Sequence, residues 1–117
     1  GAVPATVLDA KMINAIVDAA DRNKLSQYEN SAFKITGTIV AREVDIKNDP
    51  STGKKDGSAM LTLQCPEYLA TKVRCYFSVD KEHQVTQQPI GATVTVQGMF
   101  YRASSLSIEL MGCKFGG

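Results

Sequence analysis

The side chains best suited to covalent or metal chemistry are few. The chain has three cysteines, Cys65, Cys75 and Cys113, and one histidine, His83. No two cysteines form a C-x-x-C pair, so a zinc site would have to recruit distant partners. Each cysteine falls at an inward position of a predicted strand, where a thiol is inert, and His83 falls in a polar connection, where we expect it at the surface. We therefore expect no metal, no cofactor and no enzymatic activity.

Two of the cysteines could instead pair with each other. Cys75 and Cys113 fall on strands that should be neighbours in a closed five-stranded barrel, and Cys65 with Cys75 is the rival pair across a hairpin. A bond between Cys75 and Cys113 would close a loop of about 38 residues and stabilise the fold by about 3 to 4 kcal/mol. Three free thiols are the alternative.

A second set of side chains could bind an oligomeric anion. Single-stranded nucleic acid is held by cations along its phosphates and by aromatic rings that stack on its bases. The side chains of this kind on one predicted strand and two connections are Lys54, Lys55, Lys72, Arg74, Tyr76, Phe100, Tyr101 and Arg102. The alternative is that the lysines only solvate the surface and that the aromatic rings pack against the helix or the barrel rim.

The charge balance limits what such a set can do. Thirteen Lys and Arg residues against twelve Asp and Glu residues give a net charge of +1, whereas strong nucleic-acid binders usually have a clear basic excess. Any affinity for nucleic acid must therefore come from a local patch around Lys72 and Arg74.

The acidic stretch from Asp45 to Ser58 resembles a calcium loop only in composition. Lys47 stands at the third ligand position of an EF-hand, and Pro50 replaces its glycine. Asp-Pro, Thr-Gly and Asp-Gly pairs are typical of turns, and the stretch has no apolar periodicity. We expect a long loop without a metal.

The elements that position these residues begin with a helix. Apolar residues recur at three- and four-residue intervals from Leu8 to Ala20 and predict one amphipathic helix over about residues 6–22, with Thr6 and Asp9 as a weak capping box. Residues 24–31 predict a short helical turn.

The period then changes to two, which predicts half-buried strands. Gly37 should mark a bend or a bulge. In the last strand, the inward side chains should first be Leu106, Ile108 and Leu110. Gly112 should then shift the phase, so that Met111, Cys113 and Phe115 face inward. The predicted strands cover residues 33–41, 60–65, 72–79, 92–101 and 106–115.

Five such strands leave two exposed edges unless the sheet closes. The OB-fold is the commonest barrel of this size, and residues 80–89 leave room for only a turn or two of its usual helix. We predict a mainly β protein with a single domain over residues 1–117. Its five-stranded OB-fold barrel covers about residues 32–115, and the N-terminal helix plugs one end. With 44% hydrophobic residues and no apolar run of roughly 20, no transmembrane segment is expected.

Four runs carry a family resemblance. They are YENSAFKITGTIV (28–40), VRCYF (73–77), GATVTVQG (91–98) and LSIELMGCKF (106–115). In order and spacing, over about residues 8–115, the chain resembles the tRNA_anti-like family of bacterial OB-fold proteins. The long first loop and the lack of a lipobox cysteine depart from that family, and the chain opens with Gly1 in place of a leader, so a leader has been removed or never existed.

The resemblance implies an OB barrel behind a helix, often exported or lipid-anchored, with a nucleic-acid role inferred from the fold. We therefore expect an extracytoplasmic location, in the periplasm or lipid-anchored. We also expect a non-enzymatic module that binds single-stranded nucleic acid or another oligomeric anion on the face of the second and third predicted strands. The alternative is a protein-interaction or structural module of the cell envelope, without nucleic-acid activity.

Overall fold

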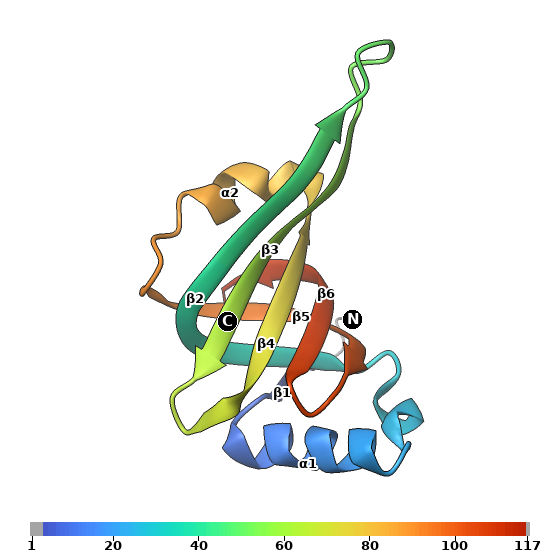
Figure 1. Ribbon diagram of the computed structural model, residues 1–117, viewed down its shortest axis with the longest axis vertical. Coiled ribbons are helices and arrows are strands. Elements are labelled where there is room, and N and C mark those ends of the chain that lie inside the picture. Colours follow the sequence, from blue (N-terminus) through green and yellow to red (C-terminus); the bar gives the residue numbers. More distant parts are fainter. Residues whose placement is uncertain (1–3, 117) are drawn as a thin grey trace.

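Alternating side chains in five segments produce five strands that close into a barrel (Figure 1). The computed structural model describes residues 4–116. In chain order, the elements are β1 (Thr6–Val7), α1 (Ala10–Asp21), η1 (Leu25–Tyr28), β2 (Ala32–Asn48), β3 (Lys55–Cys65), β4 (Tyr68–Ser78), η2 (Val79–Lys81), α2 (Glu82–Thr86), β5 (Thr93–Ala103) and β6 (Ser107–Phe115). The predicted mainly β barrel behind an N-terminal helix is confirmed.

Closure depends on β2, which pairs with a strand on each side. The order is β2–β3–β4–β6–β5, and β5 returns to β2. All neighbours are antiparallel except β4 and β6, which are parallel. The short β1 adds a parallel edge to the start of β2.

A bend in β2 lets one strand serve two neighbours. Residues 32–38 pair with β5 and residues 38–48 pair with β3, and Figure 1 shows the strand turning between these halves. The register irregularity lies between Ile39 and Ala41, after Gly37 and not at it. Gly37 instead allows a close approach, since a Cβ there would lie 2.8 Å from the carbonyl oxygen of Gln64.

Helix α1 covers one end of the barrel, at the bottom of Figure 1. Ile13, Ile16 and Ala19 form its buried side, and the two isoleucines join the barrel core. The helix begins later than predicted, because Asp9 is its N-cap and accepts a hydrogen bond from the Met12 amide. Thr6 does not cap the helix, since it belongs to β1.

The predicted loop from Asp45 to Ser58 is wrong. The arms of β2 and β3 stay paired from Asp45 with Ser58 to Asn48 with Lys55, and only residues 49–54 form a turn. This hairpin projects beyond the barrel at the top of Figure 1. Both of its faces are in solvent, so its strands lack the apolar face on which a strand prediction depends.

Two inward predictions for β6 are also wrong. Leu106 is 74% exposed in the turn before β6, and Met111 is 47% exposed on the outer face. Gly112 has φ +60°, and the change of phase there turns Cys113 into the core. The predicted helical turns at 24–31 and 80–89 are confirmed as η1 and as η2 with α2.

Candidate nucleic-acid interface

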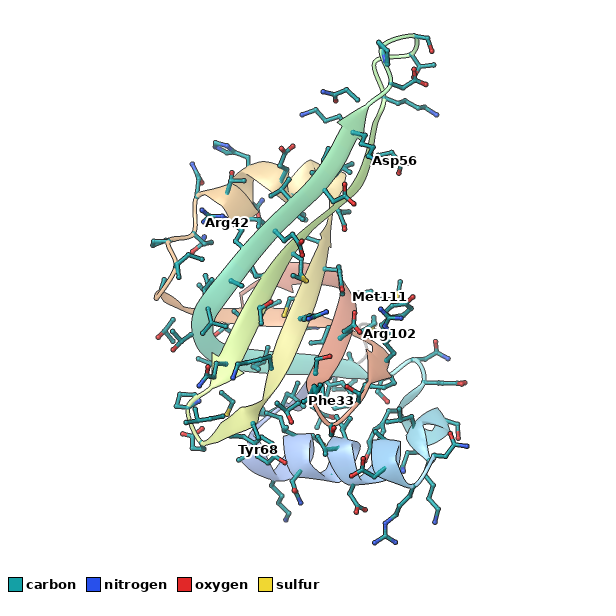
Figure 2. All side chains as sticks on the ribbon, in the orientation of Figure 1. Phe33, Arg42, Asp56, Tyr68, Arg102 and Met111 are labelled. Carbon is teal, nitrogen blue, oxygen red and sulfur yellow. The ribbon has the colours of Figure 1, made fainter. Side chains whose placement is uncertain are left out.

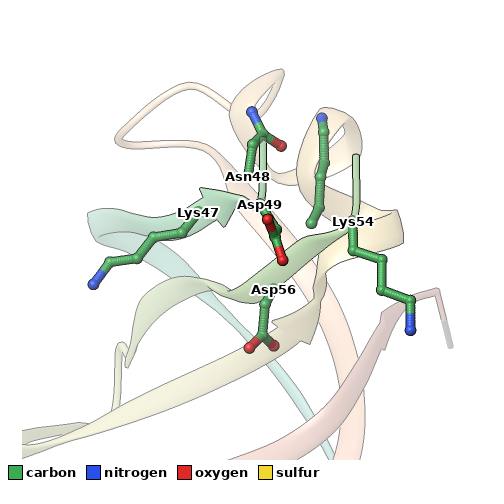
Figure 3. Close-up of a pocket in the computed structure, with 6 residues that line it drawn as sticks. Lys47, Asn48, Asp49, Lys54 and Asp56 are labelled. Carbon is green, nitrogen blue, oxygen red and sulfur yellow. The ribbon is translucent and has the colours of Figure 1, made fainter. Parts of the chain in front are cut away.

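The eight predicted binding residues fall into separate places. Lys54 and Lys55 lie at the far end of the hairpin, where six side chains line an open hollow of about 710 Å³ (Figure 3). Figure 3 shows Lys47 and Lys54 pointing away from each other, with Asp49 and Asp56 between them. Lys55 also forms an ion pair with Glu82, with Nζ 3.5 Å from Oε2.

The hairpin end therefore has little excess charge to offer a phosphate chain. Three lysines and two aspartates line the hollow, and Glu82, a third acidic residue, forms an ion pair with Lys55. The hydrogen bonds that Ser51 donates to Asp49 lower the pKa of that carboxyl, so it stays ionised.

Phe100 does not lie on a binding face. Its side chain is buried, and its ring centroid is 6.0 Å from that of Tyr28 and 6.4 Å from that of Phe33. For this residue the packing alternative holds, because the inward phase of β5 places it in the core.

Four other predicted residues meet around one buried carboxylate, Glu109 on β6. Arg102 donates from Nε to Oε2 at 2.7 Å, and the Tyr76 hydroxyl donates to Oε1 at 2.7 Å. Arg74 lies beside Glu109 in the pairing of β4 with β6. The Arg102 guanidinium lies 5.2 Å from the centre of the Tyr101 ring. We call Arg74, Tyr76, Tyr101, Arg102 and Glu109 the Glu109 cluster.

Glu109 holds the polar atoms of its neighbours in place. Burial raises the pKa of its carboxyl, but the hydrogen bonds from Arg102 and Tyr76 outweigh that effect, and the pKa lies below its ordinary value. The same bond to Glu109 raises the pKa of Tyr76 and the pKa of Arg102. At neutral pH the cluster thus joins an ionised carboxylate, a neutral phenol and two guanidinium groups. Glu109 was not among the predicted residues, since an outward glutamate on an alternating strand carries no distinguishing signal.

Lys72, the remaining predicted residue, stands on the outer face of β4 next to this cluster. It is partly buried, and its Nζ donates to the carbonyl oxygen of Leu69 at 2.7 Å. The exposed face of β4 therefore carries Lys72, Arg74 and Tyr76, as the alternation predicts.

The neighbouring face of β3 has a different character. A shallow pocket of about 380 Å³ lies over β2, β3 and β4 and is lined by Glu43, Val44, Asp45, Ser58, Met60 and Tyr76. Two carboxylates and no cation line this pocket. The predicted binding face is consequently basic on its β4 side and acidic toward β2.

All three cysteines are buried free thiols in this structure. The neighbouring Cys113 thiol and burial both raise the pKa of the Cys75 thiol. Cys65 pairs with Tyr68 and Cys75 with Leu61, an offset of four residues, or roughly 13 Å along the strands. That offset excludes the rival pair of Cys65 with Cys75.

His83 is exposed on α2, as predicted, and contacts Gln87 in the next turn. Among residues 4–116, no group of three or more histidine, cysteine or acidic side chains is arranged to hold a metal ion. No helix within the same range is long and apolar enough to cross a membrane.

The fold is similar to that of a solved structure. The chain is similar to a crystal structure from Klebsiella pneumoniae subsp. pneumoniae MGH 78578, described as a putative nucleic acid-binding lipoprotein. The TM-score is 0.68 at 15% sequence identity, over 97% of this chain and 92% of the other. No protein-family model matches the chain, and no curated protein matches it.

Proposed function

We propose that this barrel is an OB-fold that binds single-stranded nucleic acid or another oligomeric anion, without catalysing a reaction on it. Five strands in the order β2–β3–β4–β6–β5, closed through β2 and β5, support the OB assignment. The resemblance to the tRNA_anti-like family supports the same proposal, as does the similar structure described as a putative nucleic acid-binding lipoprotein.

The observation that carries the proposal is the Glu109 cluster. An open barrel surface presents two guanidinium groups and two tyrosines together, and Glu109 orients one guanidinium and one phenol. Guanidinium groups match phosphate oxygens in charge and geometry, and an exposed tyrosine ring gives a base a surface on which to stack. Tyr101 is 52% exposed.

The proposal includes an extracytoplasmic location, in the periplasm or lipid-anchored. Its support is the similar fold of the structure described as a putative nucleic acid-binding lipoprotein. A protein partner in the cell envelope is the alternative occupant of the same surface.

Fluorescence anisotropy with a labelled oligothymidylate of about 15 nucleotides tests the proposal. We expect binding at low salt that weakens steeply as salt rises, because each phosphate contact releases counterions. The double variant Lys72→Ala with Arg74→Ala should weaken binding and reduce the salt dependence.

A matched control removes the same charge elsewhere. Lys11→Ala with Lys24→Ala changes two exposed lysines near α1, and it should bind like the wild type. No binding by the folded wild type at low salt would overturn the proposal and favour the protein-interaction alternative. Binding that is unaffected by the change at Lys72 and Arg74 would overturn the role of the cluster.

A further inference from the structure

A second group of cations lies on the barrel wall beyond the Glu109 cluster. Lys34 on β2 pairs with Gln97 on β5, and Gln97 pairs with Lys114 on β6. All three alternate with buried residues and so point outward. Two strand spacings separate the lysines, which is roughly 10 Å. Within residues 4–116, neither lysine forms an ion pair.

Apolar and aromatic side chains connect this row to the cluster. Lys114 lies five residues beyond Glu109 on β6, roughly 15 Å along the strand. Between them Met99 pairs with Met111, and Tyr101 follows on β5 beside Arg102. Figure 2 shows Met111 and Arg102 on the same side of the barrel. The outer face of β4, β6 and β5 is therefore a continuous surface of cations with soft or aromatic side chains among them.

We call this surface the β6 wall. It consists of Lys34, Lys72, Arg74, Tyr76, Gln97, Met99, Tyr101, Arg102, Glu109, Met111 and Lys114.

Charge separates the β6 wall from the opposite side of β4. The wall has five cations and a single carboxylate, Glu109, which is already bonded to Arg102. The β3 side has Glu43 and Asp45 in its pocket, and the hairpin beyond it has its lysines balanced by acids. A phosphate chain leaving the Glu109 cluster is attracted toward Lys114 and Lys34, and it is repelled by Glu43 and Asp45 in the half of β2 that pairs with β3.

We propose that single-stranded nucleic acid crosses the β6 wall, from Lys72 and Arg74 past Tyr101 and Met111 to Lys114 and Lys34. This inference rests on the proposed function and assigns it a path. The lysines and arginines contact phosphates, Tyr101 and Met111 contact base faces, and Glu109 is a positioning residue for Arg102. Lys54 and Lys55 lie off the path.

Two double variants that remove equal charge test the path. Lys34→Gln with Lys114→Gln alters the wall, and Lys54→Gln with Lys55→Gln alters the hairpin. If each wall lysine contacts one phosphate, the wall variant binds oligothymidylate up to about 25-fold more weakly at about 0.1 M salt, with the salt slope reduced by about 1.4. The hairpin variant should bind like the wild type. Lys114→Glu, at an exposed site, should reproduce the loss if the double variant folds poorly.

Base contact is tested separately with Tyr101→Ser, which should weaken binding at least about fivefold. Inorganic polyphosphate has charge but no bases, so it should compete poorly for the site. Competition as strong as that of the oligonucleotide would overturn the base contacts.

The outcomes separate this inference from the proposed function. A loss of affinity for oligothymidylate that is confined to the wall variant supports the path. A loss confined to the hairpin variant, or equal losses in both, overturns the path and leaves the proposed function standing. A folded wild type that binds no oligothymidylate at low salt overturns both.

Discussion

Glu109 sets the chemistry of this surface at the scale of single residues. Its side chain is 7% exposed, while the side chain of its partner Arg102 is 65% exposed. A buried carboxylate with two donors is stable only as long as both donors remain, because an unpaired buried charge is strongly unfavourable. The carboxylate therefore orients Arg102 and Tyr76 and also reduces the positive charge of the surface by one.

Replacing Glu109 by glutamine should destabilise the fold by roughly 1–2 kcal/mol at neutral pH, because the charged hydrogen bonds are lost. The pKa of Glu109 is lowered in the folded state, so its contribution is complete above the ordinary value of 4.5 and is lost as pH falls through the lower, folded-state value. The difference between wild type and Glu109→Gln should therefore shrink in acid.

Urea unfolding at about pH 7 and about pH 3 measures this difference. Glu43→Gln is the control, since Glu43 is exposed and forms no ion pair within residues 4–116. A gap between wild type and Glu109→Gln that is the same at both pH values would contradict the assignment.

The pairing of Cys75 with Cys113 stays a prediction. After folding in the presence of oxidised glutathione, the two thiols would give up two protons and two electrons to one glutathione disulfide, which becomes two thiols. Denatured protein should then show one reactive thiol, from Cys65, and three after reduction. Cys113→Ser should show two under the oxidising conditions. Three reactive thiols in the oxidised wild type would refute the pairing.

At the scale of elements, the β2–β3 hairpin depends on a glycine at one position. Gly57 has φ +118°, and a Cβ there would lie 2.0 Å from the carbonyl oxygen of Asp45 on the opposite arm. Gly53 in the turn also has a positive φ, +71°, but a Cβ there meets nothing within 4 Å. A comparison of the two positions therefore distinguishes the effect of a clash between the strands from the effect of the backbone conformation alone.

Gly57→Ala should therefore open the hairpin while the barrel stays folded. Amide hydrogen exchange should become faster in both arms, over residues 45–48 and 55–58, whereas Gly53→Ala should affect only the turn, at a cost of roughly 1–2 kcal/mol. Rapid exchange of both arms in the wild type would contradict the hairpin itself.

The predicted elements differ from the observed ones for a common reason. Strands with one buried face alternate apolar and polar side chains, and this alternation predicts them. An example is the predicted strand at residues 72–79, although the observed β4 begins earlier, at Tyr68. The hairpin arms are paired but have no buried face, so they lack the alternation of apolar and polar side chains that predicts a strand. The start of α1 was misplaced because Thr6 and Asp9 are both good caps, and pairing of β1 with β2 decides between them.

At the scale of the whole molecule, α1 completes the core of the barrel. Ile13 and Ile16 are fully buried in the same core cluster as the strand residues. Ile16→Ala should destabilise the protein by about 2–5 kcal/mol, because it leaves a cavity at the end of the barrel.

Leu106→Ala is the matched control, since Leu106 is 74% exposed and its truncation should change stability by less than about 0.5 kcal/mol. Thermal unfolding of both variants compares them. Equal effects would mean that α1 does not plug the barrel.

The pattern of residue types predicts the five-stranded barrel, the helix before it, and most of the cations and tyrosines that could bind an anion. The types and spacing of the side chains indicate these features, because a strand or helix with one buried face needs apolar residues at a regular period. Which of those cations lie together depends on how the strands pair in the folded barrel. Register placed Glu109 between Arg74 and Arg102, joined Lys34 to Lys114 through Gln97, and left Lys54 and Lys55 among acids. A net charge of +1 cannot reveal this separation, because electrostatic attraction depends on which charges are neighbours in space and not on their sum.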